Sequence, residues 1–433
     1  MNIISHPERS KWPDLLKRPE INHCDLESGV QKIIHDVKVR GDVALAEYTR
    51  RFDGIDLDDF RVPEAELAAA SSALSASLKK AIDEARSNIY SFHKKQLAPV
   101  TTIVTTAGVK CWQKPVPMSK VGLYIPGGSA PLLSTVLMLG VPAKIAGCPE
   151  VVLCTPPDKD GKIDPGILYI AGLLGIDKVF RVGGAQAIAA MAHGTESIPA
   201  VSKIFGPGNQ YVTMAKQLVS RETVAIDMPA GPSELVVVAD STSNPAFIAS
   251  DLLSQAEHGP DSQVLLITDS GDMIGRVQEA LKNQLADLPR KEIAIEALKH
   301  SKMILLQDFD LVVDMVNDYA PEHLIIVTEN YLDLAERIVN AGSVFLGDYT
   351  PESAGDYASG TNHTLPTNGW ARSYSGVNMD SFYKKISFQE ISRYGLHNIG
   401  DAIVTMAEAE RLQAHANAVS IRLRNNGNGE SGD

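Results

Sequence analysis

Short aliphatic runs alternate with helical stretches over most of the chain after Lys120. Such alternation predicts parallel sheets with helices on both faces. A first series of predicted strands comprises Val121–Ile125, Val151–Cys154, Lys178–Val182, Lys203–Phe205 and Val224–Asp227. A second series comprises Leu235–Ala239, Val264–Thr268, Met303–Leu306, Leu324–Val327 and Ser343–Leu346. The two series predict an α/β fold with two Rossmann-like lobes, the first at 111–232 and the second at 233–365.

The two ends of the chain follow other patterns. Apolar residues recur mostly at helical spacing over Gly29–Arg51 and Pro63–Lys95, so we expect 1–110 to be a helical N-terminal region. After His363 the pattern loosens, and 366–433 is predicted to form a small C-terminal unit. This unit is expected to contain a strand near Lys385–Phe388, a final helix from about Asp401 to Val419 and a disordered tail over Asn425–Asp433.

The composition suits an aliphatic α/β core, since 44 % of the 433 residues are hydrophobic and only 6 % are aromatic. The formal net charge is −13 with no basic stripe, so we expect no nucleic-acid partner. No apolar run approaches the roughly 18 residues that span a bilayer, and Met1–Glu20 lacks the apolar stretch of a signal peptide. We therefore expect a cytoplasmic protein with no membrane partner. The cysteines form no CxxC pair and are expected to be free, mostly buried thiols: Cys24, Cys111, Cys148 and Cys154.

One predicted helix carries candidate metal ligands. The segment from Asn244 to Gln263 begins with a good N-cap and contains a stop signal at Gly259 and Pro260. Gln255 and His258 are three residues apart near the helix end, so they are expected to share one face. An amide oxygen and an imidazole could together hold a borderline metal such as Zn²⁺. Such a pair is also typical of an ordinary polar helix surface.

Two polar segments beside predicted strands carry candidate acid–base groups. Glu322 and His323 precede a strand and offer two proton acceptors of different basicity. The Gly-rich segment Gly347–His363 follows a strand, where α/β folds build sites, and it holds Asp356 and His363. The other interpretation is a partly exposed histidine and a solvated loop whose polar residues form turns.

The predicted final helix carries two further polar candidates, Glu410 and His415. They are five residues apart, which separates them by roughly 140° around an α-helix. They could not easily meet the same ion directly, and geometry would pair His415 with Arg411 or Glu408 instead. By spacing alone this is an ordinary charged helix.

Gly-rich segments follow predicted strands and precede helices at 121–131, 182–187 and 205–211. None of them matches GxGxxG, so the usual dinucleotide fingerprint is absent. The backbone amides of such a turn, with the N-terminus of the following helix, can hold an anion. Plain tight turns are the other interpretation.

Taken together, these segments resemble the histidinol dehydrogenase family. The resemblance runs from about Gly29 to Arg424. Its densest motifs, in chain order, are VGLYIPGGSAP, VGGAQAIAA, KIFGPGNQYVT, AIDMPAGPSE, DLLSQAEHGPDSQV, APEHL, GSVFLGD and ESAGDYASGTNH. Several long motifs in the right order make a chance match implausible.

The resemblance implies roles that spacing alone does not assign. The zinc ligands, for one Zn²⁺ per subunit, would be Gln255, His258, Asp356 and His415. The catalytic acid–base pair would be Glu322 and His323, and the NAD contacts would be Tyr124, Gln186 and Asn209. The substrate contacts would be Ser233, Gln255, His258, His323, Asp356, His363, Glu410 and His415. The resemblance also implies a homodimer with exchanged C-terminal parts, in which Glu410 and His415 reach the neighbouring subunit's site.

The reaction that the resemblance implies is a four-electron oxidation of L-histidinol to L-histidine through L-histidinaldehyde, using two NAD in turn, as the last step of histidine biosynthesis. His323 would accept the alcohol proton, since an imidazole titrates near neutrality. Glu322 would activate the water that hydrates the aldehyde. A thiohemiacetal route through Cys111 or Cys154 is the alternative, although both thiols are expected to be buried rather than activated.

Other functions fit parts of the sequence. A related dehydrogenase could oxidise another polar alcohol, such as a sulfonated propanediol. A zinc hydrolase could use the same ligands with a nearby Glu, but it leaves the Gly-rich turns unexplained. A non-catalytic binding protein would leave the polar groups at so many strand ends without a purpose. NAD and NADP both stay open, because no acidic residue can be assigned to the ribose.

Overall fold

The computed structural model divides the chain into two compact units. Unit 1 comprises Met1–Gln96 and Met118–Phe382, and unit 2 comprises Leu97–Pro117 and Tyr383–Asp433. The structure describes residues 1–19, 23–57, 59–127, 131–222, 224–229 and 231–424. The predicted disordered tail, the side chain of Cys24 and the middle of the first Gly-rich segment, 128–130, lie outside the described residues.

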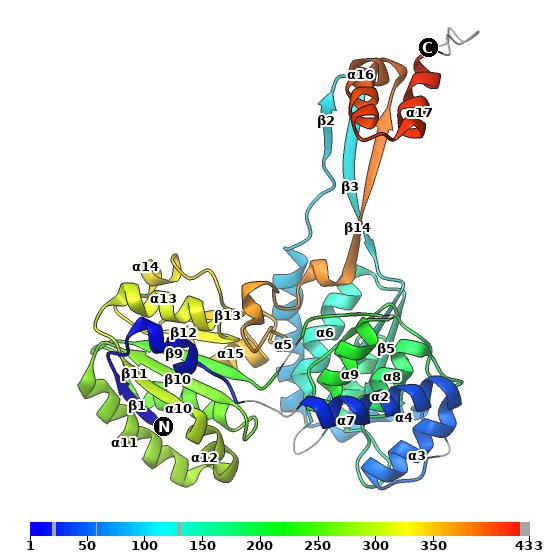
Figure 1. Ribbon diagram of the computed structural model, residues 1–433. Helices are drawn as coiled ribbons and strands as arrows, with labels where there is room; N and C mark the ends of the chain where they lie inside the picture. The colour runs from blue at the N-terminus through cyan, green and yellow to red at the C-terminus, as the bar shows by residue number, and fades with distance from the viewer. Residues whose placement is uncertain (20–22, 58, 128–130, 223, 230, 425–433) are drawn as a thin grey trace. The chain divides into compact units, whose positions relative to one another are not determined.

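The first lobe of unit 1, in which Figure 1 labels β5 among the helices α6, α8 and α9, is built on a parallel sheet in the order β6-β5-β4-β7-β8. Its strands are β4 (Lys120–Tyr124), β5 (Glu150–Thr155), β6 (Lys178–Arg181), β7 (Lys203–Phe205) and β8 (Ala225–Ile226). The helices between them are α6 (Leu133–Ala146), α7 (Pro165–Leu173), α8 (Gly184–His193) and α9 (Gln210–Ser220). Every strand of the first predicted series is present, with small shifts at its ends. The aliphatic side chains of β4 and β5 are buried, as expected for strands covered on both faces.

The second lobe is built on a parallel sheet in the order β1-β11-β10-β9-β12-β13. Its strands are β1 (Asn2–Ser5), β9 (Glu234–Ala239), β10 (Gln263–Thr268), β11 (Lys302–Leu305), β12 (His323–Ile326) and β13 (Ser343–Leu346). Its helices are α10 (Pro245–Ala256), α11 (Gly271–Asp287), α12 (Lys291–His300), α13 (Phe309–Tyr319), α14 (Tyr331–Ala335) and α15 (Glu352–Tyr357). The second predicted series is therefore present as well, and the α/β class with two parallel-sheet lobes is confirmed.

The N-terminal region is mostly helical, as predicted, but each of the two predicted helical stretches is divided into two separate helices. Its helices are α1 (Trp12–Leu15), α2 (His23–Arg40), α3 (Asp42–Asp53), α4 (Glu64–Ala73) and α5 (Ala76–Lys94). Gly41 separates α2 from α3 with a φ of +53°, and Ser75 caps α5 by accepting a hydrogen bond from the Leu78 N–H. The prediction did not include β1, which pairs with β11 and joins the N-terminal arm (Met1–Pro19) to the second lobe. Short 3₁₀ turns lie at Arg9–Lys11, Trp370–Arg372 and Met379–Phe382.

Unit 2 is a small antiparallel sheet with a helical pair. Its elements are β2 (Thr102–Thr106), β3 (Val109–Pro117), β14 (Tyr383–Ile391), α16 (Arg393–Ala409) and α17 (Gln413–Arg424). The predicted strand near Lys385–Phe388 is the middle of β14. The prediction of one final helix was wrong, because the backbone turns at Arg411, whose φ is +59°. The separation of roughly 140° expected for one helix therefore does not apply to Glu410 and His415.

Among the described residues, no helix combines the length and the apolar character that crossing a bilayer requires.

Candidate functional site

The candidate site lies at the amino ends of neighbouring strands in the second lobe. β9 begins at Glu234 and β12 begins at His323, and these strands pair with each other. The turn after α10 brings His258 to the same edge, and α15 brings Glu352 and Asp356. Segments that are far apart in the sequence therefore meet at one edge of one sheet.

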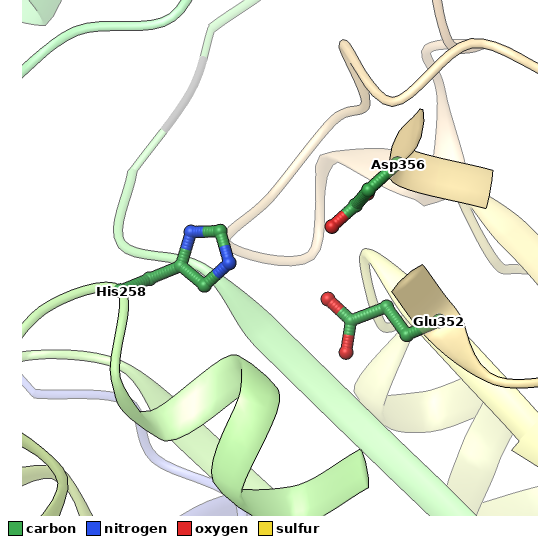
Figure 2. Close-up of side chains that lie close together, drawn as sticks. All are labelled: His258, Glu352 and Asp356. Carbon is green, nitrogen blue, oxygen red and sulfur yellow. The ribbon is translucent and has the colours of Figure 1, made fainter. Parts of the chain in front are cut away.

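His258, Glu352 and Asp356 form a group that could hold a metal ion. Each offers one ligand atom, and these atoms all lie within 4.8 Å of one another. Figure 2 shows the His258 imidazole and both carboxylates pointing towards one another. Glu352 and Asp356 are four residues apart on α15, which places them on one helix face.

The predicted ligand Gln255 is fully buried near the end of α10. Its amide nitrogen, assigned by its hydrogen-bonding partners, donates to Glu352 Oε2 at 3.0 Å. The structure thus brings Gln255, His258 and Asp356 together. One expectation about them was wrong: α10 ends at Ala256, so His258 lies in the following turn and does not share a helix face with Gln255.

The acidic groups of this site have raised pKa values. Burial raises the pKa of Glu352 well above its usual range, and the negative charges of Asp356, Glu322 and Asp251 raise it further. Burial also raises the pKa of Asp356 to about 7, and that of Asp251 to about 7. No lysine or arginine of the described residues forms an ion pair with these carboxyls. A divalent cation would offset this repulsion, and imidazole, carboxylate and amide donors suit Zn²⁺.

His258 borders solvent, and the protein atoms packed around its ring nevertheless lower its pKa by desolvation. The imidazole is therefore neutral at physiological pH. Neutral imidazole is the form in which histidine binds a metal ion.

Glu322 and His323 are held by the main chain of a single residue, Glu234. The Glu234 N–H donates to Glu322 Oε2 at 2.9 Å, and the Glu234 carbonyl oxygen lies 3.3 Å from His323 Nδ1. The Glu234 carbonyl oxygen only accepts, and the proton is assigned to Nδ1 on this contact, although the Gln255 amide nitrogen also lies 3.3 Å from Nδ1; Nε2 then carries the lone pair. His323 Nε2 is buried without a hydrogen-bond partner among the described residues, and it lies 3.8 Å from Asp356 Oδ1.

Burial shifts the pKa values of this acid–base pair in opposite directions. The pKa of Glu322 rises well above its usual range, mainly by desolvation. Desolvation lowers the pKa of His323 to about 3, so the expectation that this imidazole titrates near neutrality was wrong. The His323 ring is therefore neutral throughout the physiological range, so one of its ring nitrogens is unprotonated there.

His363 connects this edge to the first lobe. Its Nδ1 lies 3.9 Å from Asp356 Oδ1, and its Nε2 lies 3.3 Å from the hydroxyl of Thr135 on α6. Burial lowers its pKa to about 4, so this ring is neutral as well. The structure therefore places His363 beside the same carboxylate that His258 and His323 face.

The predicted NAD contacts lie at the carboxyl ends of strands in the first lobe. Tyr124 ends β4, and its buried hydroxyl accepts a hydrogen bond from the Gly184 N–H at 3.0 Å. Gln186, in the first turn of α8, is buried, and its side-chain oxygen has no hydrogen-bond partner among the described residues. Asn209 caps α9 by accepting from the N–H groups of Tyr211 and Val212. Contact between these side chains and a nucleotide stays a prediction.

A buried ion pair fixes the turn before α9. Lys216 pairs with Asp227, and its Nζ donates to the Gly206 carbonyl oxygen at 2.8 Å. Asp227 in turn accepts from the Gly206 N–H at 2.8 Å. Gly206 has a φ of +125°, and a Cβ there would meet the Tyr124 carbonyl oxygen at 2.0 Å, so only glycine fits.

A cleft of about 1460 Å³ in unit 1 extends from this turn to the candidate metal group. Its lining includes Pro207, Gly208 and Asn209 of the first lobe, and Ser233 and His258 of the second. A predicted nucleotide contact, a predicted substrate contact and a predicted zinc ligand therefore line the same cavity.

Glu410 and His415 belong to unit 2. Glu410 caps the C-terminus of α16, and His415 lies in the first turn of α17. Their predicted contacts with substrate and zinc stay predictions.

Three residues of the site, Asp251, Glu352 and Glu234, were not predicted from the sequence. Glu352 could have been recognised by its spacing of four residues from Asp356 after the helix-starting Pro351. Glu234 gave no signal, because it opens an aliphatic strand and its partners lie far away in the sequence.

Comparison with known proteins places the chain among relatives of similar length. The sequence profile described as histidinol dehydrogenase matches residues 16–423. The chain belongs to the histidinol dehydrogenase family. The histidinol dehydrogenase of Bacteroides thetaiotaomicron is 59 % identical over 98 % of this chain and 99 % of that protein. The histidinol dehydrogenase of Xanthomonas euvesicatoria is 53 % identical over 95 % of this chain and 96 % of that protein.

A solved structure agrees with this family assignment. The crystal structure of histidinol dehydrogenase from Elizabethkingia anophelis superimposes with a TM-score of 0.96 at 53 % identity, covering 98 % of each chain. Membership of the histidinol dehydrogenase family makes this chain an oxidoreductase by class.

Proposed function

We propose that this protein oxidises L-histidinol to L-histidine through L-histidinaldehyde, with zinc and two NAD per turnover. The observation that carries the proposal is the convergence of the His258, Glu352 and Asp356 ligand atoms beside Glu322 and His323. The neighbouring cleft reaches Asn209 at the start of α9, where a nucleotide would be held.

The zinc site is proposed on the donor set and its charge. Gln255, His258 and Asp356 would supply ligands, Glu352 lies close enough to add a carboxylate, and His415 of unit 2 would complete the set. Zinc, when bound, would hold the amino and imidazole nitrogens of the substrate and so fix its alcohol carbon for hydride loss. The raised carboxyl pKa values support this assignment, because the protein supplies no cation of its own there.

The proton transfers are assigned to the two residues held by Glu234. His323 Nε2 has a free lone pair in a buried position, so it would take the alcohol proton in the first oxidation. Glu322 would accept a proton from the water that hydrates the aldehyde. A cation beside the site would lower the pKa of Glu322 towards the range that this role requires.

The nucleotide site is proposed on the first lobe. NAD, when bound, supplies the hydride acceptor for both oxidations. Pro207, Gly208 and Asn209, next to the fixed Gly206, line the cleft, and the unpartnered oxygen of Gln186 is suited to a donor group of a ligand. Tyr124 would act through the Gly184 turn that its hydroxyl holds.

We also propose a homodimer in which unit 2 reaches the neighbouring subunit. Unit 2 carries exposed apolar side chains that association would cover, among them Ile103, Val104, Ile386, Phe388, Ile391 and Met406. Two inactive variants, His258→Asn and His415→Asn, would then complement each other. Co-expressed with different tags, they should recover about a quarter of wild-type activity, since half of the dimers would contain one intact site. Absence of any recovery would contradict the exchange.

A cytoplasmic location stays a prediction.

The direct test of the reaction mixes the purified protein with Zn²⁺, NAD and L-histidinol. We expect two NADH for each L-histidine formed, followed by absorbance and by amino-acid analysis. One NADH per product with accumulating aldehyde would refute the four-electron reaction. Faster turnover of a sulfonated propanediol would favour the related dehydrogenase, and cleavage of an amide or ester without NAD would favour the hydrolase.

A further inference from the structure

A buried ion pair ties the N-terminal arm to the second lobe. Arg18 Nη2 donates to Glu234 Oε2 at 2.8 Å, and Arg18 Nε also bonds the same carboxylate. The same Nη2 donates to the Tyr319 carbonyl oxygen at 2.8 Å, and the guanidinium lies 3.9 Å from the centre of the Tyr319 ring. Only 3 % of the Glu234 side chain and 17 % of the Arg18 side chain are exposed. The pair is thus two-pronged, stacked and almost closed to water.

Glu234 connects this ion pair to the proposed acid–base residues. Its N–H holds Glu322, and its carbonyl oxygen faces Nδ1 of His323. Its carboxylate also accepts from the Asn368 N–H at 2.7 Å, and Asn368 has a φ of +54°. The side chain of Glu234 is therefore fixed by two separate segments, while its main chain fixes both groups that move protons.

The energetics make the arm a necessary part of this arrangement. A carboxylate buried without a partner is strongly unfavourable, so burial raises the pKa of Glu234 and Arg18 opposes that shift. Without the guanidinium, Glu234 would either take up a proton or move towards solvent. Either change would shift the main chain that holds Glu322 and His323.

We propose that Arg18 and Glu234 are positioning residues, through which the N-terminal arm orients Glu322 and sets the His323 tautomer. The inference rests on the proposed function. It adds that the arm forms part of the active site although it contributes no group to the chemistry.

The kinetic test uses Arg18→Ala in the zinc-loaded protein. We expect kcat to fall about 10- to 100-fold, because a small misplacement of catalytic groups has effects of that size. Arg18 lines the same cleft, but its guanidinium is bonded to Glu234 and Tyr319, so the KM values for histidinol and NAD should stay within about threefold. Added guanidinium at sub-denaturing concentration should restore part of the rate, while equal sodium chloride should not. Arg18→Lys should restore little, because an ammonium lacks the two-pronged geometry.

A spectroscopic test is independent of turnover. In zinc-loaded protein with ¹⁵N-labelled histidine, the His323 signals, assigned by their loss in His323→Asn, should report a proton on Nδ1. In Arg18→Ala they should report a mixture of tautomers. An unchanged Nδ1 tautomer would overturn the proposal. If wild-type protein failed to oxidise histidinol, the proposed function would fail, and this measurement would still decide the positioning role.

Val313→Ala is the matched stability control, because Val313 is buried in the same core cluster as Tyr319 and bonds to none of these groups. It should lower the unfolding midpoint while leaving kcat within about twofold of wild type. A kcat for Arg18→Ala within about twofold of wild type, or a loss that Val313→Ala reproduces, would overturn the proposal. If Arg18→Ala does not fold, Glu234→Gln decides: lowered kcat with retained KM supports the role, and unchanged kcat overturns it.

Discussion

The two lobes place their polar groups at opposite ends of their strands. In the first lobe, Tyr124, Gln186 and Asn209 follow strands and sit at their carboxyl ends. In the second lobe, Glu234 and His323 begin strands, so the proposed acid–base site lies at the amino ends. The first arrangement follows the general rule for α/β sheets, and the second departs from it. The common architecture of the lobes therefore does not determine where a site forms.

The two sites also differ in which groups balance the charges of their buried carboxylates. In the first lobe, Asp227 is paired with Lys216 and accepts main-chain hydrogen bonds. In the second lobe, Glu352 and Asp356 face each other and neutral imidazoles. The buried carboxylate of the first lobe is neutralised by a lysine, whereas these two carboxyls of the second lobe have no lysine or arginine partner among the described residues. The proposed nucleotide site is therefore already charge-balanced, whereas the proposed metal site requires a cation.

The largest effect should come from removing a ligand on the second lobe. We expect His258→Asn to bind less than a tenth of the zinc and to lose about a thousandfold in turnover, because substrate positioning depends on the metal. Metal analysis and NADH absorbance measure both. His300→Asn, at an exposed histidine of the same lobe, should change neither. Full zinc content with full turnover in His258→Asn would contradict the ligand set.

A smaller and more selective effect should follow from Glu322→Gln. The aldehyde oxidation should fall about a hundredfold more than the alcohol oxidation, because only the former needs an activated water. Single-turnover measurements started from histidinol and from histidinaldehyde separate the two steps. Equal losses in both steps would show that the assigned role is wrong.

In the first lobe, Lys216→Met tests whether the ion pair between Lys216 and Asp227 supports nucleotide binding. The unpaired Asp227 should cost about 3–5 kcal/mol of unfolding free energy and loosen the turn at Gly206. The KM for NAD should rise about tenfold, while kcat at saturating NAD stays within about threefold. Lys178→Met, which breaks the more exposed pair with Glu150, should cost no more than about 1 kcal/mol and leave the KM for NAD unchanged. An unchanged KM in Lys216→Met would remove this turn from nucleotide binding.

The charges of the second lobe should also appear in the pH dependence of stability. The pKa values of Asp356 and Asp251 are raised to about 7 in the folded state, so the folded metal-free protein binds more protons than the unfolded chain above pH 6.5. Its unfolding free energy should therefore fall as pH rises from 6.5 to 8, by about 1.4 kcal/mol per pH unit for each retained proton. Histidines with lowered folded-state pKa values oppose this near pH 6.5, where the unfolded chain still holds about half of their protons, so the fall should be clearest from about pH 7 to 8, where the folded state also keeps protons on Glu322 and Glu352. Urea unfolding measures the slope, which should flatten when zinc is bound, and a rising free energy would contradict the account.

The smallest effect should be that of Cys154→Ala. Cys154 is fully buried on β5, and burial raises the pKa of its thiol, so it is not an activated nucleophile. Turnover should stay within about threefold of wild type, with a modest loss of stability from the vacated volume. A loss of about a thousandfold would revive the thiohemiacetal route.

Much of the fold could be predicted from the sequence, because its signals are local. The aliphatic runs predicted both series of strands, and the capping of α10 by Asn244 was predicted from residue type and is present. The breaks at Gly41 and Arg411 were missed, since the apolar spacing continues across them while the backbone turns. β1 was missed because its short, partly exposed edge strand carries no clear periodicity.

The candidate site was less predictable, because its geometry depends on distant contacts. Glu322 and His323 stood out as adjacent polar residues before a core strand. The resemblance, not the spacing, assigned the ligand set that includes Gln255 and Asp356. Glu234 could not be found, because its importance comes from Arg18, which is 216 residues away, and from its own main chain.

Anomalous diffraction at the zinc edge, from crystals of the zinc-loaded protein, tests the central claim most directly. We expect a peak about 2.0–2.2 Å from a ring nitrogen of His258 and from a carboxylate oxygen of Asp356. A zinc peak bound elsewhere, with none between these two side chains, would contradict it.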